Sequence, residues 1–125
     1  MSTFTSTSVS LQQAYRIVAD DLAGVRQIID EELRSERAEM SELVEQVARF
    51  RGKMLRPALL LMTARATGGV EPIHRGLAAV VELFHLATLI HDDVLDEADT
   101  RRGAATINHR WNNESAVMLG DWLIS

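Results

Sequence analysis

Cysteine is absent from this 125-residue chain, and aromatic residues make up only 5% of it. Without cysteine, a disulfide framework and a thiolate metal site are excluded, and nothing indicates an oxidising compartment. The first ten residues have neither the basic start nor the apolar stretch of a secretory signal. We therefore predict a cytoplasmic location and a flexible Ser/Thr-rich tail over residues 1–10.

Positive charge is scarce as well. The net charge is −5 and the pI is near 5.3, and no basic patch with interleaved aromatic residues is present, so we expect no nucleic-acid partner. No unbroken apolar run approaches the roughly 20 residues of a transmembrane helix, so we expect no transmembrane segment. Hydrophobic residues at 46% and charged residues at 25% are typical of one globular domain.

Apolar residues recur at helical spacing, and no strand pattern stands out, which predicts an all-α fold. Pro57 and Pro72 suit first helical turns, and Gly68 with Gly69 suits a helix end. The expected helices are a long amphipathic one over residues 11–33, a short one capped by Ser41, a buried one over residues 58–66, a central one that starts at Pro72, and a last one that starts near Glu114.

The central helix runs from apolar residues into acid. At 100° per residue, Asp96 lies about 40° round the helix from Asp92, so both carboxylates project from one face, and His85 lies on the same stripe. Such carboxylates repel one another unless a cation compensates them, and oxygen ligands suit Mg²⁺ together with phosphate oxygens. The alternative is a solvated helix end that pairs with Arg101 and Arg102. The apolar side of this central helix is predicted to consist of Leu77, Val80, Val81, Phe84, Thr88, His91 and Leu95.

Two basic motifs flank this acidic one. Gly52 removes a side chain so that backbone can approach a ligand, and Lys53 and Arg56 place two cations one turn apart, suited to gripping a diphosphate. Arg101 and Arg102 supply planar guanidinium groups that match phosphate oxygens. The alternative for the first motif is a loop with solvated cations.

Taken together, these motifs resemble the N-terminal part of the trans-isoprenyl diphosphate synthases, the polyprenyl synthetase family of all-helical prenyltransferases. The resemblance runs from about Val47 to Ser125. It implies that residues 11–125 are the N-terminal helical portion of an isoprenoid synthase bundle. It also implies a reaction in which isopentenyl diphosphate is condensed head-to-tail with an allylic diphosphate.

The same resemblance implies roles for individual residues. Asp92 and Asp96, with Asp93 beside them, would hold Mg²⁺ on the allylic diphosphate, which Arg101 would also contact. No protein base is demanded, and His91, which lies off the acidic stripe, is interpreted as structural. The residues implied to bind isopentenyl diphosphate are Lys53, Arg56, His85 and Arg102.

Product length is also predicted from the resemblance. Bulky residues four and five places before the acidic motif close the product tunnel in such enzymes, whereas Thr88 and Ala87 are small. With the likeness of residues 106–121 to long-chain members, this favours a medium or long polyprenyl product. Two departures are Arg51, where a second glycine is usual, and Ala105, where proline is frequent.

The family's second aspartate-rich motif is missing, so we expect no turnover by the chain alone. Its last apolar residues, among them Trp122 and Leu123, lead us to expect a homo- or hetero-oligomer. The alternative function is a non-catalytic helical subunit that regulates a full-length synthase. A terpene cyclase is disfavoured by Lys53, Arg56 and Arg102, because a cyclase needs no second diphosphate.

Overall fold

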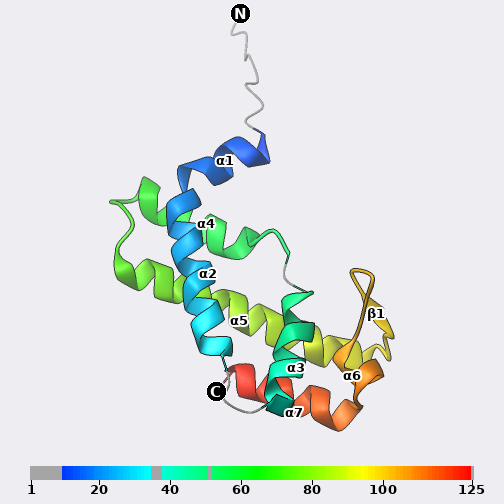
Figure 1. Ribbon diagram of the computed structural model, residues 1–125. Helices are drawn as coiled ribbons and strands as arrows, with labels where there is room; N and C mark the ends of the chain where they lie inside the picture. Colours follow the sequence, from blue (N-terminus) through cyan, green and yellow to red (C-terminus); the bar gives the residue numbers. More distant parts are fainter. Residues whose placement is uncertain (1–9, 35–37, 51, 125) are drawn as a thin grey trace, which may run out of the picture.

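The computed structural model describes residues 10–34, 38–50 and 52–124, and almost all of its regular structure is helical (Figure 1). The all-α class is therefore confirmed. The predicted tail before Ser10, and Arg51, lie outside the described residues. In chain order the elements are α1 (Leu11–Ile17), α2 (Ala19–Leu33), α3 (Ala38–Ala48), α4 (Leu55–Ala66), α5 (Pro72–Leu95), β1 (Thr100–Arg101), β2 (Ala104–Ala105), α6 (Ile107–Arg110) and α7 (Asn113–Ile124).

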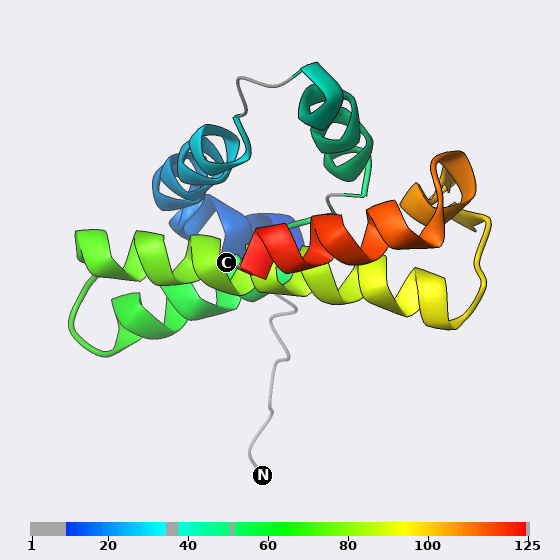
Figure 2. The same ribbon diagram turned by 90° about the horizontal axis from the view of Figure 1, so that it is seen from below.

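The central helix α5 joins two hydrophobic clusters. Ala78 and Ala79 lie in the first cluster with residues of α2 and α4, and Leu86 and Ile90 lie in the second with residues of α3, α6 and α7. Figure 2 shows α7 lying along α5, and Trp122 packs against both clusters. Each large apolar side chain buried in this way stabilises the fold by about 1.5–3 kcal/mol. Because α5 contributes residues to both clusters, it is the helix against which the others pack.

The first predicted helix is wrong in one respect, because it is broken at Val18. Val18 has φ −115° and ψ 16°, and α1 leaves α2 at an angle (Figure 1). The Arg65 guanidinium on α4 donates a 3.2 Å hydrogen bond to the Ile17 carbonyl beside the break, where a helix end leaves carbonyls without partners. Arg65 is 48 positions away, so no local pattern predicts this contact.

The ends of α3 and α4 test three further predictions. Helix α3 begins before Ser41, which therefore lies inside the helix and is not its N-cap. Pro57 lies in the first turn of α4, as predicted. After α4, Gly68 and Gly69 have φ values of 142° and 108°, and the Gly69 N–H donates to the Ala64 carbonyl at 2.9 Å. The predicted glycine stop is confirmed.

The face of α5 that enters the core differs from the predicted one. Pro72 starts the helix as expected, but Val80, Phe84 and Leu95 are 60%, 53% and 80% exposed. Helix α5 is apolar on most sides, so its periodicity does not select one face, and small residues let α4 and α7 pack closely. The buried positions are Ala78, Ala79, Glu82, Leu86, Ala87, Ile90 and Asp93.

Helix α5 is also long and apolar enough, by length and composition, to cross a membrane. Polar residues such as Arg75, Glu82 and His85 are scattered within the helix, so it is not the unbroken apolar run that the sequence analysis considered. Helices α2, α4 and α7 all pack against α5, and Glu82 and Asp93 on it are buried. These contacts are those of the central helix in a helical bundle.

A small antiparallel hairpin follows α5, where no strand is predicted. Thr100 pairs with Ala105 and Arg101 with Ala104. The two turn residues, Arg102 and Gly103, have φ values of 50° and 77°, as in a two-residue type I′ turn. Each strand has only two residues, which is too short to produce a visible alternation.

Candidate functional site

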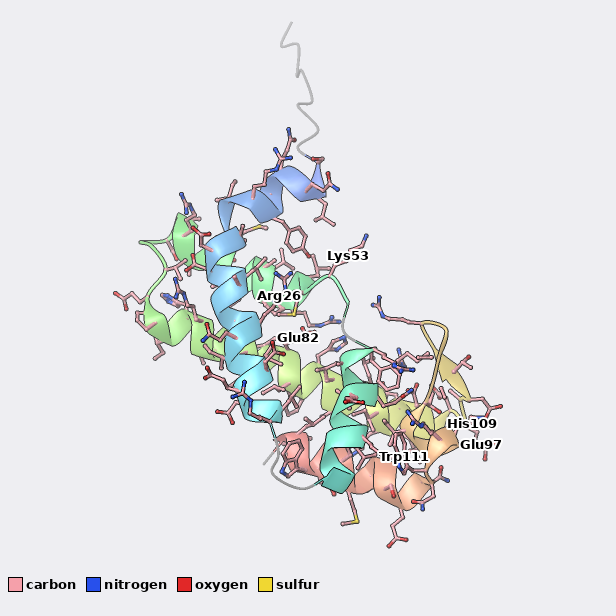
Figure 3. All side chains as sticks on the ribbon, in the orientation of Figure 1. Arg26, Lys53, Glu82, Glu97, His109 and Trp111 are labelled. Atoms are coloured by element: carbon pink, nitrogen blue, oxygen red, sulfur yellow. The ribbon has the colours of Figure 1, made fainter. Side chains whose placement is uncertain are left out.

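A tight turn at the end of α5 brings the chain back toward its acidic residues. Glu97 has φ 52°, its N–H donates to the Val94 carbonyl at 3.2 Å, and the Ala98 N–H donates to the Asp93 carbonyl at 2.9 Å. This is the Schellman pattern of a helix end, here with a non-glycine residue in the left-handed conformation. Figure 3 shows Glu97 at the end of the molecule that carries the hairpin.

Asp92 and Asp96 are open to solvent on the last turn of α5. Both are exposed, and neither side chain has a hydrogen-bond or ion-pair partner in the part of the chain that the structure describes. A helix C-terminus carries negative partial charge, so unpaired carboxylates there lower stability. The structure therefore has two carboxylates one helical turn apart that no hydrogen bond or ion pair among the described residues neutralises.

Asp93 behaves differently from its two neighbours. Its side chain is 4% exposed and accepts three hydrogen bonds from Arg101: from Nη2 to Oδ1 at 2.7 Å, and from Nε to Oδ2 at 3.0 Å and to Oδ1 at 3.1 Å. The hydrogen bonds to Asp93 raise the pKa of Arg101, and the charges of Asp93, Asp92 and Asp96 raise it further. The position of Arg101 beside the acidic motif is thus fixed by Asp93, whose carboxylate is occupied by this ion pair.

The basic motifs meet at a cavity of about 250 Å³. Arg56 Nη1 lies 3.0 Å from His85 Nε2. A Cβ at Gly52 would come within 2.8 Å of the Arg102 guanidinium, so Gly52 makes room for Arg102, a partner that the sequence did not indicate. The walls are formed by Leu11, Tyr15, Phe50, Gly52, Lys53, Met54, Leu55, Arg56, Glu82, His85, Leu89 and Arg102.

His85 lies between the basic cavity and the acidic end of α5. Burial lowers the pKa of His85, the positive charges of Arg56, Arg101 and Arg102 lower it further, and the negative charge of Asp92 opposes them. The neutral ring is therefore favoured, and its Nε2 can accept a hydrogen bond from Arg56. Charged residues of both the basic and the acidic motifs thus affect the pKa of His85.

The two residues predicted to set product length lie between His85 and Asp92. Ala87 is fully buried, and Thr88 is half-buried with its hydroxyl donating to the His85 carbonyl at 2.7 Å. Neither residue lines the basic cavity. Their effect on product length stays a prediction.

His91 faces α7, away from the cavity. Its Nε2 lies 3.1 Å from the Val117 carbonyl, and a Cβ at Gly120 would come within 2.1 Å of the same nitrogen. Helices α5 and α7 can approach this closely because Gly120 has no side chain. The geometry agrees with a structural role for His91.

The acidic end can supply only part of a metal site. In the described parts of the chain, no three His, Cys, Asp or Glu side chains are grouped closely enough to hold a metal ion. Asp92 and Asp96 provide two carboxylates, so a metal there needs oxygen ligands from elsewhere. Mg²⁺ fits such a site, because it commonly binds through one or two carboxylates plus phosphate oxygens and water.

Sequence reasoning missed the residues that support the hairpin. Gln46 on α3 is 1% exposed, its Nε2 donates to the Ala105 carbonyl, and its Oε1 accepts from Arg110 Nη1 at 2.7 Å. The Thr106 hydroxyl donates to the Ala98 carbonyl at 2.7 Å. One signal was available for Gln46, which is a polar residue at helical spacing from the apolar Leu43 and Phe50.

The sequence profile described as "Polyprenyl synthetase" matches residues 37–125, which is most of the chain. The chain belongs to the polyprenyl synthetase family. Its expected place in the N-terminal part of the isoprenoid synthase bundle is also confirmed by solved structures of that fold.

Three similar proteins show how much of this polyprenyl synthetase fold the chain represents. The all-trans-nonaprenyl-diphosphate synthase (geranyl-diphosphate specific) of Rhodobacter capsulatus is 43% identical over 86% of this chain and 34% of the relative. The octaprenyl diphosphate synthase of Escherichia coli is 38% identical over 92% and 36%. A Caulobacter crescentus polyprenyl synthase, crystallised with calcium and isoprenyl diphosphate, has a TM-score of 0.85 at 36% identity, over 92% and 35%. The chain spans about a third of the length of these relatives.

Proposed function

We propose that this chain is the diphosphate-binding portion of a prenyltransferase that joins isopentenyl diphosphate head-to-tail to an allylic diphosphate, giving a medium- or long-chain all-trans polyprenyl diphosphate. The observation that supports it is the position of His85, which lines the basic cavity while Asp92 lies two turns later on the same helix. A site with separate regions of positive and negative charge suits two diphosphates, one bound by cations and one bound through a metal ion.

In this proposal the basic cavity binds isopentenyl diphosphate. Lys53, Arg56 and Arg102 donate to its phosphate oxygens, and the short distance between Arg56 and His85 keeps the Arg56 guanidinium oriented. The cavity and the carboxylates are carried by the same helix, α5, through His85 and Asp92. The two substrates are therefore held at a fixed separation, which lowers the entropy cost of reaction.

Asp92 and Asp96 would hold Mg²⁺, which supplies positive charge to the diphosphate of the allylic substrate when it is bound. Arg101, fixed by Asp93, stabilises charge on the departing pyrophosphate. The allylic C–O bond breaks with its electron pair on oxygen, the isopentenyl double bond forms the new C–C bond, and a proton passes to pyrophosphate. Neither His85 nor His91 needs to act as a base.

A second candidate is a non-catalytic helical subunit of a complete synthase. The observation that favours it is the exposed apolar row on α5, which includes Leu77, Val80 and Phe84. In both cases we propose residues 11–125 as one helical unit after a tail over residues 1–10, a homo- or hetero-oligomeric assembly, and a cytoplasmic location.

The experiment that tests the proposal is incorporation of radiolabelled isopentenyl diphosphate. The chain is assayed alone and as a fusion, joined to the C-terminal two-thirds of the Rhodobacter capsulatus relative, with geranyl and farnesyl diphosphate as primers. We expect no turnover by the chain alone and Mg²⁺-dependent turnover by the fusion. A folded fusion that stays inactive with both primers, while the intact relative is active, would contradict the proposal and favour the second candidate.

A further inference from the structure

Tyr15 on α1 lines the basic cavity together with Lys53, Arg56, His85 and Arg102. Its hydroxyl oxygen is buried and has no hydrogen-bond partner among the residues that the structure describes. Buried hydroxyl groups in proteins are almost always hydrogen-bonded, and an unpaired one lowers stability. A hydroxyl group on a cavity-lining residue can gain its missing partner from a ligand bound in that cavity.

The position of Tyr15 depends on the break at Val18. Because α1 turns away from α2 at this residue, Tyr15 lies against the cavity, and Arg65 holds the neighbouring Ile17 carbonyl. Helix α1 has no buried residue of its own. Tyr15 itself packs against the first hydrophobic cluster from a half-buried position, so a small movement of α1 is enough to bring the hydroxyl onto a bound ligand.

The chemistry of the cavity indicates which kind of group the hydroxyl contacts. Tyr15 and Lys53 also line a wider groove of about 680 Å³ together with Arg16 and Arg26, so cations surround the approach to the cavity. Cations donate hydrogen bonds and cannot accept one from a phenol, and the Glu82 carboxylate on the cavity wall already has an interaction partner. A phosphate oxygen accepts from the phenol and from the cations at once, and its charge strengthens each bond.

We propose that Tyr15 donates its hydroxyl hydrogen bond to the diphosphate of the ligand in this cavity, as a fifth binding residue beside Lys53, Arg56, His85 and Arg102. This inference rests on the proposed function of the cavity. Helix α1 then takes part in substrate binding, because the Tyr15 hydroxyl supplies a hydrogen-bond donor that carries no charge. A water molecule bound to the hydroxyl is the competing explanation, and the experiment distinguishes the two.

Tyr15 is the only tyrosine in the chain, so tyrosine labelled with ¹³C in its ring reports on this one residue. The labelled chain is titrated with isopentenyl diphosphate, with inorganic pyrophosphate and with isopentenyl alcohol. We expect both phosphorylated probes to shift the ring resonance and the alcohol to leave it unchanged. Unshifted resonances in the presence of bound diphosphate would overturn the proposal.

Affinity measurements with variants separate this proposal from the function on which it rests. Tyr15→Phe removes one oxygen, and we expect isopentenyl diphosphate to bind about tenfold more weakly, with helicity unchanged. The matched control is Ile17→Ala, which changes an exposed apolar residue on the same helix that does not line the cavity and should alter affinity less than twofold. If Arg56→Gln weakens binding but Tyr15→Phe does not, the Tyr15 proposal fails and the cavity assignment stands. If Arg56→Gln has no effect, the assignment of the cavity fails as well.

Discussion

The acidic end of α5 and the basic cavity differ in how their charged side chains are paired within the protein. At the acidic end, Asp93 is buried and paired with Arg101, whereas Asp92 and Asp96 are exposed without a partner among the described residues. In the cavity, Arg56 contacts the ring of His85, whose pKa is lowered so that the ring adds no positive charge. Of these three carboxylates, the fold thus neutralises Asp93 alone and leaves Asp92 and Asp96 exposed.

The largest effect is expected at the exposed carboxylates. In the fusion, Asp92→Asn should lower Mg²⁺-dependent turnover about 100-fold or more, because a ligand for the metal is lost. Its unfolding free energy should stay the same or rise by about 0.3–1 kcal/mol, since a negative charge leaves a helix C-terminus. Steady-state rates and thermal unfolding measure the two effects.

The matched control for this change is Asp99→Asn, which removes an exposed carboxylate beyond the end of the same helix. Its turnover should remain within a few-fold of the parent fusion. Equal losses in both variants, or a loss of helicity in Asp92→Asn, would show that Asp92 is structural and would remove the contrast with Asp93.

The second effect concerns the buried carboxylate. Arg101→Gln leaves Asp93 buried without its ion-pair partner, and we expect a loss of about 2–3 kcal/mol of unfolding free energy in chemical denaturation. The double variant Arg101→Gln with Asp93→Asn should recover part of that loss, because no buried charge remains. An unchanged stability in the single variant would mean that Asp93 is as well solvated as Asp92.

The third effect is a dependence on pH. The lowered pKa of His85 means that the unfolded chain binds more protons than the folded chain between that pKa and about 6.5. The stabilisation that comes from the neutral ring is therefore complete above pH 6.5 and is lost as the pH falls below it. His85→Gln should flatten this part of the profile, as thermal unfolding across the pH range would measure. A parallel slope in both proteins would contradict it.

Binding of an anionic ligand should change the electrostatic environment of the His85 ring. Inorganic pyrophosphate in the basic cavity adds negative charge close to His85, so the pKa of His85 should rise when it binds. Titration of the ring resonances by NMR, with and without pyrophosphate, measures the shift. An unchanged titration curve with pyrophosphate bound would place the anion away from His85.

The smallest effect is expected at the turn between the two regions. Glu97 has φ 52°, which costs a non-glycine residue about 1 kcal/mol, so Glu97→Gly should raise the unfolding free energy by about 0.5–1 kcal/mol. Glu114→Gly, in the first turn of α7, is the control and should lower it. A loss of stability in both variants would mean that the Glu97 side chain makes contacts that outweigh its strain.

Several features of the site were predictable because they depend on neighbours in sequence. Helical spacing alone places Asp92 and Asp96 one turn apart, and it places His85 two turns before Asp92. The first turn at Pro57 and the glycine stop after α4 are local as well. These features follow from backbone geometry, which a few adjacent residues decide.

Other features depended on contacts between distant segments. The break at Val18 is accompanied by a hydrogen bond from Arg65, and Gln46 binds the hairpin across 59 positions. The exposed face of α5 was misjudged because α4 and α7 pack on its small residues. The space at Gly52 is taken by Arg102, which the type I′ turn directs back. No local pattern carries information on such contacts.

The sequence by itself determined that this chain is helical. It also determined that carboxylates lie at the end of the central apolar helix and that basic residues precede and follow this helix in the chain. The tertiary structure decided which of those charges the protein neutralises. Asp93 is paired and Asp92 is not because the hairpin returns Arg101 to one side of α5 only. The side that a returning segment covers depends on packing between helices that are far apart in the chain, so it cannot be derived from residue spacing alone.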